Sequence, residues 1–229
     1  SFGDLTNNLR AFNSADIENT VKPGDVIVSM LPGEFHVQIA KLAIAKKANF
    51  VSSSYISPQM RHLNDKAKDC GISLVNEVGL DPGIDHLMAH KLVEEYRKSK
   101  QNSLENELSF ISYCGGIPKI PNDFKYKFSW SPAGVIKALN NDAKYITKGK
   151  INTVTPYKSI SSYSISDENF EAYPNRDSTP YVSEYLFDDK WKVKEFVRGT
   201  LRLDGWKEAW QDIFSMLENK SDNIEAAIN

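Results

Sequence analysis

The first third of the chain alternates short apolar runs with helical patterns, and this alternation restricts the fold more than any other feature. The run 25–31 is almost wholly apolar, as in a parallel strand that helices cover on both faces. In the segment 34–48, apolar residues recur at helical spacing. We expect further strands at 49–57 and 72–78, and further helices at 58–70 and 84–96. Such βα units, joined by short loops, predict an α/β fold with a parallel, doubly wound sheet.

The rest of the chain follows a different pattern. A polar stretch, 97–107, marks a linker or a helix end. Beyond it we expect strands at 108–118, 151–154, 157–165 and 191–202, and helices at 131–146 and 205–218. Strands with long connections and few helices indicate an α+β domain. We therefore predict an α/β domain over 1–103 and an α+β domain over 104–229.

A dinucleotide-binding fold starts with a strand and a glycine-rich turn whose backbone N–H groups hold the pyrophosphate. The chain has no G-x-G-x-x-G, and the segment 7–21 before the first expected strand has the pattern of a charged helix. Either the chain is truncated at its N-terminus or the fold does not bind nucleotides, and the pattern alone leaves both open.

Composition excludes several classes of function. The 229 residues contain no apolar run long enough to cross a membrane, and the first residues lack the order of a secretory signal. A formal net charge of -2, with both signs scattered, gives no basic stripe, so we expect neither nucleic acid nor a membrane as partner. The cysteines are Cys70 and Cys114 alone, which fits a protein of the reducing cytoplasm.

Ligands of open α/β sheets bind beyond the carboxyl ends of the strands. Those ends carry the stretch Leu31–Gly33, the run Ser52–Tyr55 and the stretch Glu77–Asp81. The hydroxyl groups suit a ribose or a polar substrate, although a polar strand end that faces water is the plain alternative. Asp81 has the place of a helix N-cap that is followed by proline in the first turn. That account leaves Gly79 unexplained, and glycine there fits a close approach of the backbone to a ligand.

Two histidines and a cysteine have structural as well as functional interpretations. His86 and His90 share one helix face, but no third ligand cluster accompanies them, so we expect a structural face and no metal site. Cys114 precedes Gly115 and Gly116. A buried inert thiol and a thiol close to a ligand are about equally supported there.

Three arginines, Arg176, Arg198 and Arg202, lie in short polar stretches beside glycine, proline or asparagine. A guanidinium group can bind a carboxylate through two parallel hydrogen bonds, so these side chains indicate an anionic substrate. Ordinary ion pairs with neighbouring acidic residues are the alternative.

Six stretches together resemble one known family. They are "SSSYISP", "NEVGLDPGIDHL", "SYCGGIP", "YKFSWSPAGV", "YPNRDST" and "RGTLR", and they occur in the order found in the saccharopine reductases, also called saccharopine dehydrogenases (NADP+, L-glutamate-forming). The resemblance covers the chain from about Asp25 to about Gly205. It implies that 1–103 is the C-terminal part of a Rossmann-like NADP-binding domain and 104–229 part of a substrate-binding domain. It also implies that the glycine-rich turn precedes Ser1 and that the protein continues past Asn229.

The same resemblance implies an oxidoreductase of lysine metabolism, here expected in lysine biosynthesis, with NADP as cofactor. The implied reaction joins L-glutamate and 2-aminoadipate 6-semialdehyde as an imine, which NADPH reduces to saccharopine, and it also runs in reverse. The implied NADP site comprises Leu31, Ser53, Ser54, Gly79, Leu80, Asp81 and Trp130. The implied saccharopine contacts are Ser54, Tyr55, Asp81, Arg176, Thr200, Leu201 and Arg202, with Cys114 nearby.

This chemistry suits the residue types. The three carboxylates of saccharopine suit arginines, and Trp130 offers a flat face for a nicotinamide ring or the substrate. Asp81 is the strongest candidate for proton transfer at the secondary amine, with Tyr55 and Cys114 as further catalytic candidates. We expect a small-molecule substrate, with a homodimer as one assembly. A relative that reduces another imine, such as carboxyspermidine dehydrogenase, and a non-catalytic module without the nucleotide loop are the alternatives.

Overall fold

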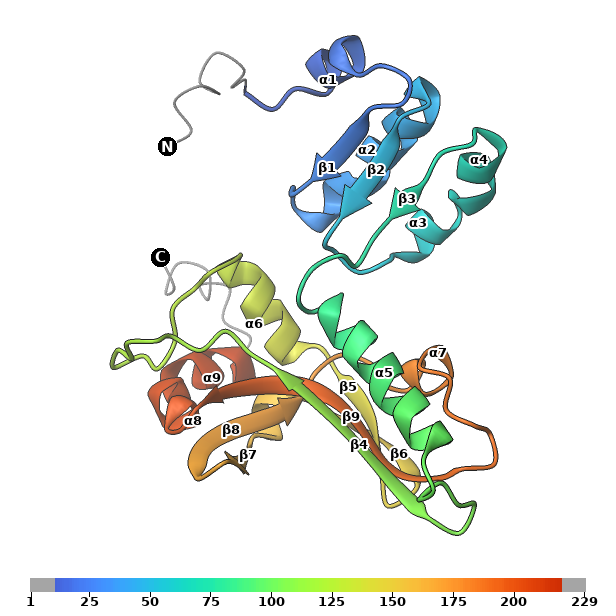
Figure 1. Ribbon diagram of the computed structural model, residues 1–229. Coiled ribbons are helices and arrows are strands. Elements are labelled where there is room, and N and C mark those ends of the chain that lie inside the picture. Colours follow the sequence, from blue (N-terminus) through green and yellow to red (C-terminus); the bar gives the residue numbers. More distant parts are fainter. Residues whose placement is uncertain (1–10, 220–229) are drawn as a thin grey trace. The chain divides into compact units, whose positions relative to one another are not determined.

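A parallel sheet with strand order β1-β2-β3 organises the first of two units, Ser1–Met88 (Figure 1). The structure is a computed structural model, and it describes residues 11–219. In β1 (Val26–Ser29) and β2 (Asn49–Ser52), the register places Ser29 opposite Ser52, and β3 (Leu74–Val75) pairs with β2. The helices that precede α5 are α1 (Ser14–Thr20), α2 (Gly33–Lys46), α3 (Pro58–Arg61) and α4 (Asn64–Asp69). The predicted parallel sheet with helices is thus confirmed.

The helix α2 supplies most of the core of this unit. Its Ile39, Ala40 and Ala43 are almost fully buried and form one cluster with Phe50 of β2. Each large apolar side chain buried in this way contributes about 1.5–3 kcal/mol relative to exposure. The helix ends at Lys47, which adopts the left-handed conformation that closes many helices. This packing holds the ends of β1 and β2 at fixed positions.

The second unit, Ala89–Asn229, is built on a mixed sheet of order β6-β5-β9-β8-β7, with β4 parallel to β9 (Figure 1). Its strands are β4 (Glu107–Cys114), β5 (Ala143–Thr147), β6 (Lys150–Val154), β7 (Ser161–Ile165), β8 (Glu168–Pro174) and β9 (Lys192–Leu203). Its helical elements are α6 (Pro132–Asn140), the 3₁₀ turn Pro156–Lys158, α7 (Tyr181–Glu184), α8 (Trp206–Ala209) and α9 (Gln211–Glu218). The expected α+β character is confirmed.

The helix α5 (Ile84–Lys98) runs from the first unit into the second. Its Ala89 and Val93 are buried in a cluster with Phe110 of β4 and Phe196 of β9. The rings of Phe110 and Phe196 stack with centroids 4.7 Å apart, within the range of favourable aromatic contacts. A separate cluster around Trp206 and other aromatic side chains packs α6, α8 and α9 together.

Strand β9 is the central strand of the second unit, because it pairs with β4, β5 and β8. Successive side chains of a strand point to opposite faces, so Phe196, Arg198, Thr200 and Arg202 share one face. In the register, Cys114 of β4 lies beside Thr200. The strand therefore carries two buried arginines on the same face as its buried aromatic core.

Several sequence predictions of element bounds are wrong. The predicted helix 131–146 ends at Asn140, and its last residues belong to β5. The predicted helix 58–70 is divided into α3 and α4, and the predicted helix 205–218 into α8 and α9. The predicted strand 157–165 begins at Ser161.

Two other expectations concern the boundaries of the chain's parts. Of the expected helix 7–21, residues 7–10 lie outside the described residues, and 14–20 are helical as α1. The division of the structure falls within α5, whereas the sequence places a domain boundary at 103/104, and the domain bounds stay a prediction. Among residues 11–219, no helix is both long and apolar enough to span a membrane.

Candidate functional site

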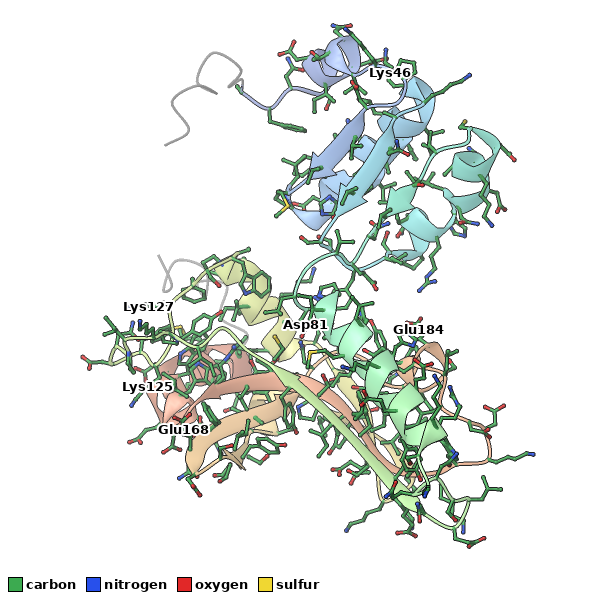
Figure 2. All side chains as sticks on the ribbon, in the orientation of Figure 1. Lys46, Asp81, Lys125, Lys127, Glu168 and Glu184 are labelled. Atoms are coloured by element: carbon green, nitrogen blue, oxygen red, sulfur yellow. The ribbon has the colours of Figure 1, made fainter. Side chains whose placement is uncertain are left out.

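Two predicted catalytic residues of the first unit are hydrogen-bonded to each other. Tyr55 follows β2, and Asp81 lies in the turn that precedes α5, where Figure 2 labels it. The Tyr55 hydroxyl donates to Asp81 Oδ1 over 2.7 Å. The Asp81 residue is exposed and Tyr55 is half-buried, so solvent and a ligand can both reach the pair. A phenol and a carboxylate at this distance form an acid–base pair that can hold or pass on a proton.

The turn 79–83 is closed by its own backbone. The Gly79 N–H donates to the carbonyl of Pro82 over 2.9 Å, and the Ile84 N–H donates to the carbonyl of Gly79 over 3.0 Å. A Cβ atom at position 79 would lie 3.2 Å from Ser53 Cβ and 3.1 Å from the Pro82 carbonyl oxygen. A methyl group there would fit only if these neighbours moved by a few tenths of an ångström, so contact with the chain itself favours glycine at this position. The role of Gly79 in cofactor binding stays a prediction.

The expected capping role of Asp81 is wrong. The helix α5 begins at Ile84, so Pro82 is not in its first turn. The side chain of Asp85 accepts the Gly83 N–H over 2.6 Å at the start of the helix. This helix end therefore uses the carboxylate of Asp85, whereas that of Asp81 accepts the Tyr55 hydroxyl.

Glu77, which the sequence placed at a strand end without a role of its own, connects the ends of β2 and β3 by hydrogen bonds. Its backbone φ is +59°, a left-handed conformation uncommon for residues other than glycine. Its N–H donates to the Ser54 carbonyl over 3.2 Å, and its Oε1 accepts the Ile56 N–H over 2.9 Å. Its Oε2 lies 3.2 Å from His86 Nε2. An acidic residue just after a short apolar run was the only signal in the sequence.

His86 and His90 take part in different contacts. His86 faces Glu77, whereas the His90 ring packs edge-on against Tyr185 with centroids 5.6 Å apart. Within the described residues, no group of three or more His, Cys, Asp or Glu side chains is arranged to hold a metal ion.

A network of hydroxyl groups around His36 joins the ends of β1 and β2. This network was not predicted from the sequence. Ser29 Oγ lies 2.9 Å from His36 Nδ1, and Ser54 Oγ lies 2.8 Å from Nε2. Ser52 Oγ is 3.2 Å from the same Nε2. Burial lowers the pKa of His36, and the nearby Glu34 opposes this effect, so the imidazole is neutral at neutral pH.

The predicted cofactor residues of the first unit gather at one edge of its sheet. Leu31 follows β1, Ser53 and Ser54 follow β2, and Gly79, Leu80 and Asp81 follow β3. The register of the strands and the bond from Glu77 to Ser54 bring these ends side by side. Leu80 is 64% exposed, whereas Leu31 packs partly against the apolar core.

In the second unit, Arg202 is a buried cation enclosed by aromatic rings. Its residue is 6% exposed. The guanidinium carbon lies 4.7 Å from the ring centroid of Tyr126, 5.4 Å from that of Trp206 and 5.7 Å from that of Tyr173. One terminal nitrogen donates to the Leu201 carbonyl over 3.3 Å.

Among residues 11–219, no carboxylate lies within ion-pair distance of Arg202, and its Nε has no hydrogen-bond partner. Burial raises the pKa of Tyr173, while Arg202 and Thr200 oppose that shift through their contacts with its hydroxyl. A desolvated cation is costly unless an anion accompanies it. The cluster is therefore suited to bind an anion, and a carboxylate fits the guanidinium fork.

The other predicted substrate arginine lies elsewhere on the same sheet. Arg176 is exposed and follows β8, and its neighbour Asn175 donates its N–H to the Arg198 carbonyl over 3.1 Å. Arg198 stacks on the Tyr181 ring, 4.0 Å from its centroid. Positions 198 and 202 are four residues apart, which corresponds to about 13 Å along a strand. The strand register thus places the residue before Arg176 beside position 198, and not beside position 202.

Cys114 is half-buried and lies beside Thr200 in the strand register. A Cβ atom on Gly115 would collide with the carbonyl of Leu201, so this glycine is required where β4 meets β9, and not for access to a ligand. Trp130 is 53% exposed, and its indole lies so close to Gly134 of α6 that a Cβ atom there would be 2.5 Å from the ring. The position of this ring thus depends on a glycine in the helix.

Comparisons with known proteins give a consistent result. Residues 79–224 match the family model described as "Saccharopine dehydrogenase C-terminal domain", and residues 6–75 match "Saccharopine dehydrogenase NADP binding domain". The chain is 39% identical to "Saccharopine dehydrogenase [NADP(+), L-glutamate-forming]" from Pyricularia oryzae, with 86% of this chain and 44% of that protein covered. Identity to the Saccharomyces cerevisiae protein of the same name is also 39%, covering 97% and 50%.

A longer relative and a solved structure point to the same family. "Alpha-aminoadipic semialdehyde synthase, mitochondrial" from Rattus norvegicus is 38% identical over 84% of this chain and 21% of its own length. The solved apo saccharopine dehydrogenase (L-Glu forming) from Saccharomyces cerevisiae superposes with a TM-score of 0.74 at 40% identity, covering 89% of this chain and 46% of that one. The chain spans about half the length of the fungal relatives it matches.

Proposed function

Because the chain belongs to the saccharopine dehydrogenase family, we propose that the full-length protein is an NADP-dependent oxidoreductase that forms and cleaves saccharopine. In the reducing direction, L-glutamate and 2-aminoadipate 6-semialdehyde lose water to form an imine, and the C=N bond is then reduced. In the reverse direction, the secondary amine is oxidised and the imine is hydrolysed. The names of the fungal relatives support both the substrate and the cofactor.

The single observation that carries this proposal is the buried Arg202. Its guanidinium lies among three aromatic rings, and no acidic side chain of the described residues lies within ion-pair distance of it. Glu171, which is opposite Arg202 in the strand register, accepts the Lys207 N–H instead. A substrate carboxylate would supply that charge and would accept two parallel hydrogen bonds. Saccharopine carries three carboxylates, so a second one can be bound by Arg176. Thr200 and Leu201 are the proposed neighbours of the first.

Proton transfer in this reaction takes place at the substrate nitrogen and at water. Asp81 is the proposed acceptor of these protons, because its carboxylate is exposed and held at its Oδ1 by the Tyr55 hydroxyl. Tyr55 is proposed to orient the carboxylate and to share its proton. Cys114 is a further candidate, which its position beside Thr200 supports.

The residues at the sheet edge fit part of a dinucleotide. The hydroxyl groups of Ser53 and Ser54 are half-buried at the carboxyl ends of parallel strands, where the ribose of such a cofactor binds in related folds. Leu31, Gly79 and Leu80 are the proposed backbone and apolar contacts, and Trp130 offers a partly exposed ring face in the other unit. NADPH, when bound, supplies the hydride for reduction of the imine.

The experiment that tests the proposal uses the full-length protein. Saccharopine is added with NADP+ or with NAD+, and the absorbance of the reduced cofactor is followed. We expect reduction of NADP+ that depends on saccharopine. A folded protein that reduces neither cofactor would overturn the proposed function, and activity with another imine-derived amine alone would assign a different substrate.

Two further proposals concern the setting of the enzyme. We infer a cytoplasmic location, which the low number of cysteines, Cys70 and Cys114, supports. Names of mammalian relatives carry the word "mitochondrial", so fractionation of cells that express the full-length protein is the decisive measurement. We also propose a homodimer, for which light scattering of the full-length protein gives the mass.

A further inference from the structure

One buried histidine joins the ends of the first two strands. His36 lies in the first turn of α2 and is 4% exposed. Its Nδ1 is 2.9 Å from Ser29 Oγ at the end of β1. Its Nε2 is 2.8 Å from Ser54 Oγ, just beyond β2, and 3.2 Å from Ser52 Oγ at the end of β2. Both ring nitrogens are therefore used, one toward each strand.

The three serines differ in what else they can reach. Ser29 and Ser52 are opposite each other in the register and are 4% and 1% exposed, so their hydroxyls serve only the interior. Ser52 Oγ also accepts the Ser54 N–H over 3.1 Å. Ser54 is held twice, at its hydroxyl by His36 and at its amide by Ser52. It is only partly buried, so a ligand can reach it.

Packing alone does not explain histidine at this position. The His36 ring meets the Phe50 ring edge-on with centroids 6.1 Å apart, a contact that a leucine or phenylalanine would also make. An apolar side chain would leave the buried hydroxyl of Ser29 without a partner among the described residues. The residue type is therefore set by hydrogen bonding.

The neutral ring has one donor and one acceptor, which makes the network directional. With the hydrogen on Nε2, the ring donates to Ser54 Oγ, and Ser54 keeps its own hydrogen for a ligand. With the hydrogen on Nδ1, Ser54 donates to Nε2 and offers a ligand its lone pairs. In both forms the hydrogen bond to His36 holds the Ser54 oxygen in place.

We propose that His36 is a positioning residue, which holds the Ser54 hydroxyl in the orientation that binds the dinucleotide. The inference rests on the proposed function, because Ser54 is a proposed cofactor contact. His36 itself is buried beneath the serines and is not proposed to touch the cofactor or the substrate.

Two substitutions separate the two sides of the ring. In His36→Gln the amide reaches the place of Nε2 and can still bond Ser54, whereas in His36→Asn it reaches only the place of Nδ1 and Ser29. The dissociation constant and the KM for NADP+ are measured on the full-length protein, together with kcat. We expect His36→Asn to weaken NADP+ binding about tenfold, the effect of one hydrogen bond. His36→Gln should stay within about threefold of wild type.

Ser29→Ala is the matched control, because it removes the hydroxyl on the opposite side of the ring. It should lower Tm and leave the affinity for NADP+ within about threefold of wild type. Equal NADP+ affinity of His36→Asn and His36→Gln, or a loss in Ser29→Ala as large as in His36→Asn, would overturn the inference.

A second readout does not depend on activity or on the folding of the histidine variants. The ¹⁵N resonances of the His36 ring are recorded in wild type, Ser54→Ala and Ser29→Ala. Ser54→Ala should move the Nε2 resonance, Ser29→Ala the Nδ1 resonance, and NADP+ should move Nε2 in wild type. If the chemical shift of Nε2 is the same in Ser54→Ala as in wild type, the inference is overturned. Wild type that binds no NADP+, with Nε2 still sensitive to Ser54→Ala, overturns the proposed function instead.

Discussion

Replacement of Arg202 by methionine should separate substrate binding from stability. The guanidinium is buried among three rings and has no acidic partner among the residues that the structure describes. Methionine keeps the length and the contact with the rings and removes the charge. In wild type without substrate, the buried charge is unfavourable, so we expect the free energy of unfolding of Arg202→Met to be unchanged or higher.

Substrate binding should respond in the opposite direction. Two charge-assisted hydrogen bonds from a guanidinium to a carboxylate contribute about 1.5–3 kcal/mol each. Their joint loss of about 3–6 kcal/mol corresponds to a rise of about 10²–10⁴-fold in the KM for saccharopine. Arg202→Lys keeps the charge without the planar fork and should fall between wild type and Arg202→Met.

The assay is the initial rate of NADP+ reduction by full-length protein at saturating NADP+, with unfolding followed by circular dichroism. Arg97→Met is the matched control, because Arg97 also lies over an aromatic ring, 5.5 Å from the centroid of Trp191, but is exposed. It should leave the KM for saccharopine unchanged. If Arg202→Met binds saccharopine within about threefold of wild type, the assignment of this cluster to a substrate carboxylate is refuted.

Three other substitutions test single contacts. Tyr55→Phe removes the hydrogen bond to Asp81 and should lower kcat about 10–100-fold with little change in Tm. Steady-state kinetics and thermal unfolding measure these two quantities. An unchanged kcat would contradict a role of Tyr55 in proton transfer. Gly115→Ala places a methyl group against the backbone of β9 and should lower the free energy of unfolding in urea by about 1–3 kcal/mol, whereas Gly116→Ala, which has room, should not. Because burial lowers the pKa of His36 below 6.5, the ring stays neutral in the folded protein while the unfolded chain takes up a proton as the pH falls through about 6.5. Wild type should therefore lose more stability than His36→Gln between pH 7.5 and about 5.5 in urea titrations, and parallel losses would disprove this.

The alternation of strands and helices was predictable because each element carries its own periodicity. The failure at β5 shows the limit of that signal. In the sequence, Tyr145 and Ile146 continue the helical spacing of α6. In the structure they belong to β5 and pair with β6 across a turn. Lys148 and Gly149 both have positive φ, as in the tight turns that favour hairpins, and the sequence "KGK" was the available indication.

The candidate site was also predicted only in part. Tyr55 and Asp81 were predicted as residues, and the structure adds that they share a hydrogen bond. His36 was missed because its partners come from the ends of two other strands, and one histidine in an apolar helix has no local pattern. Periodicity describes neighbours along the chain, whereas this network depends on neighbours across the sheet.

The glycines at two strand ends show that residues needed for backbone packing differ from the residues proposed to contact a ligand. Gly79 and Gly115 both lie where the sequence predicts a ligand. Gly115 is required by contact with the backbone of Leu201, and Gly79 is favoured by its contacts with Ser53 and the Pro82 carbonyl. The proposed ligand contacts at these two strand ends are instead Ser54 and Cys114. We expect the glycines to fix the backbone where each strand ends, and the proposed contact residues to determine what that end binds. Substitutions at the glycines should therefore act first on stability, and substitutions beside them first on affinity.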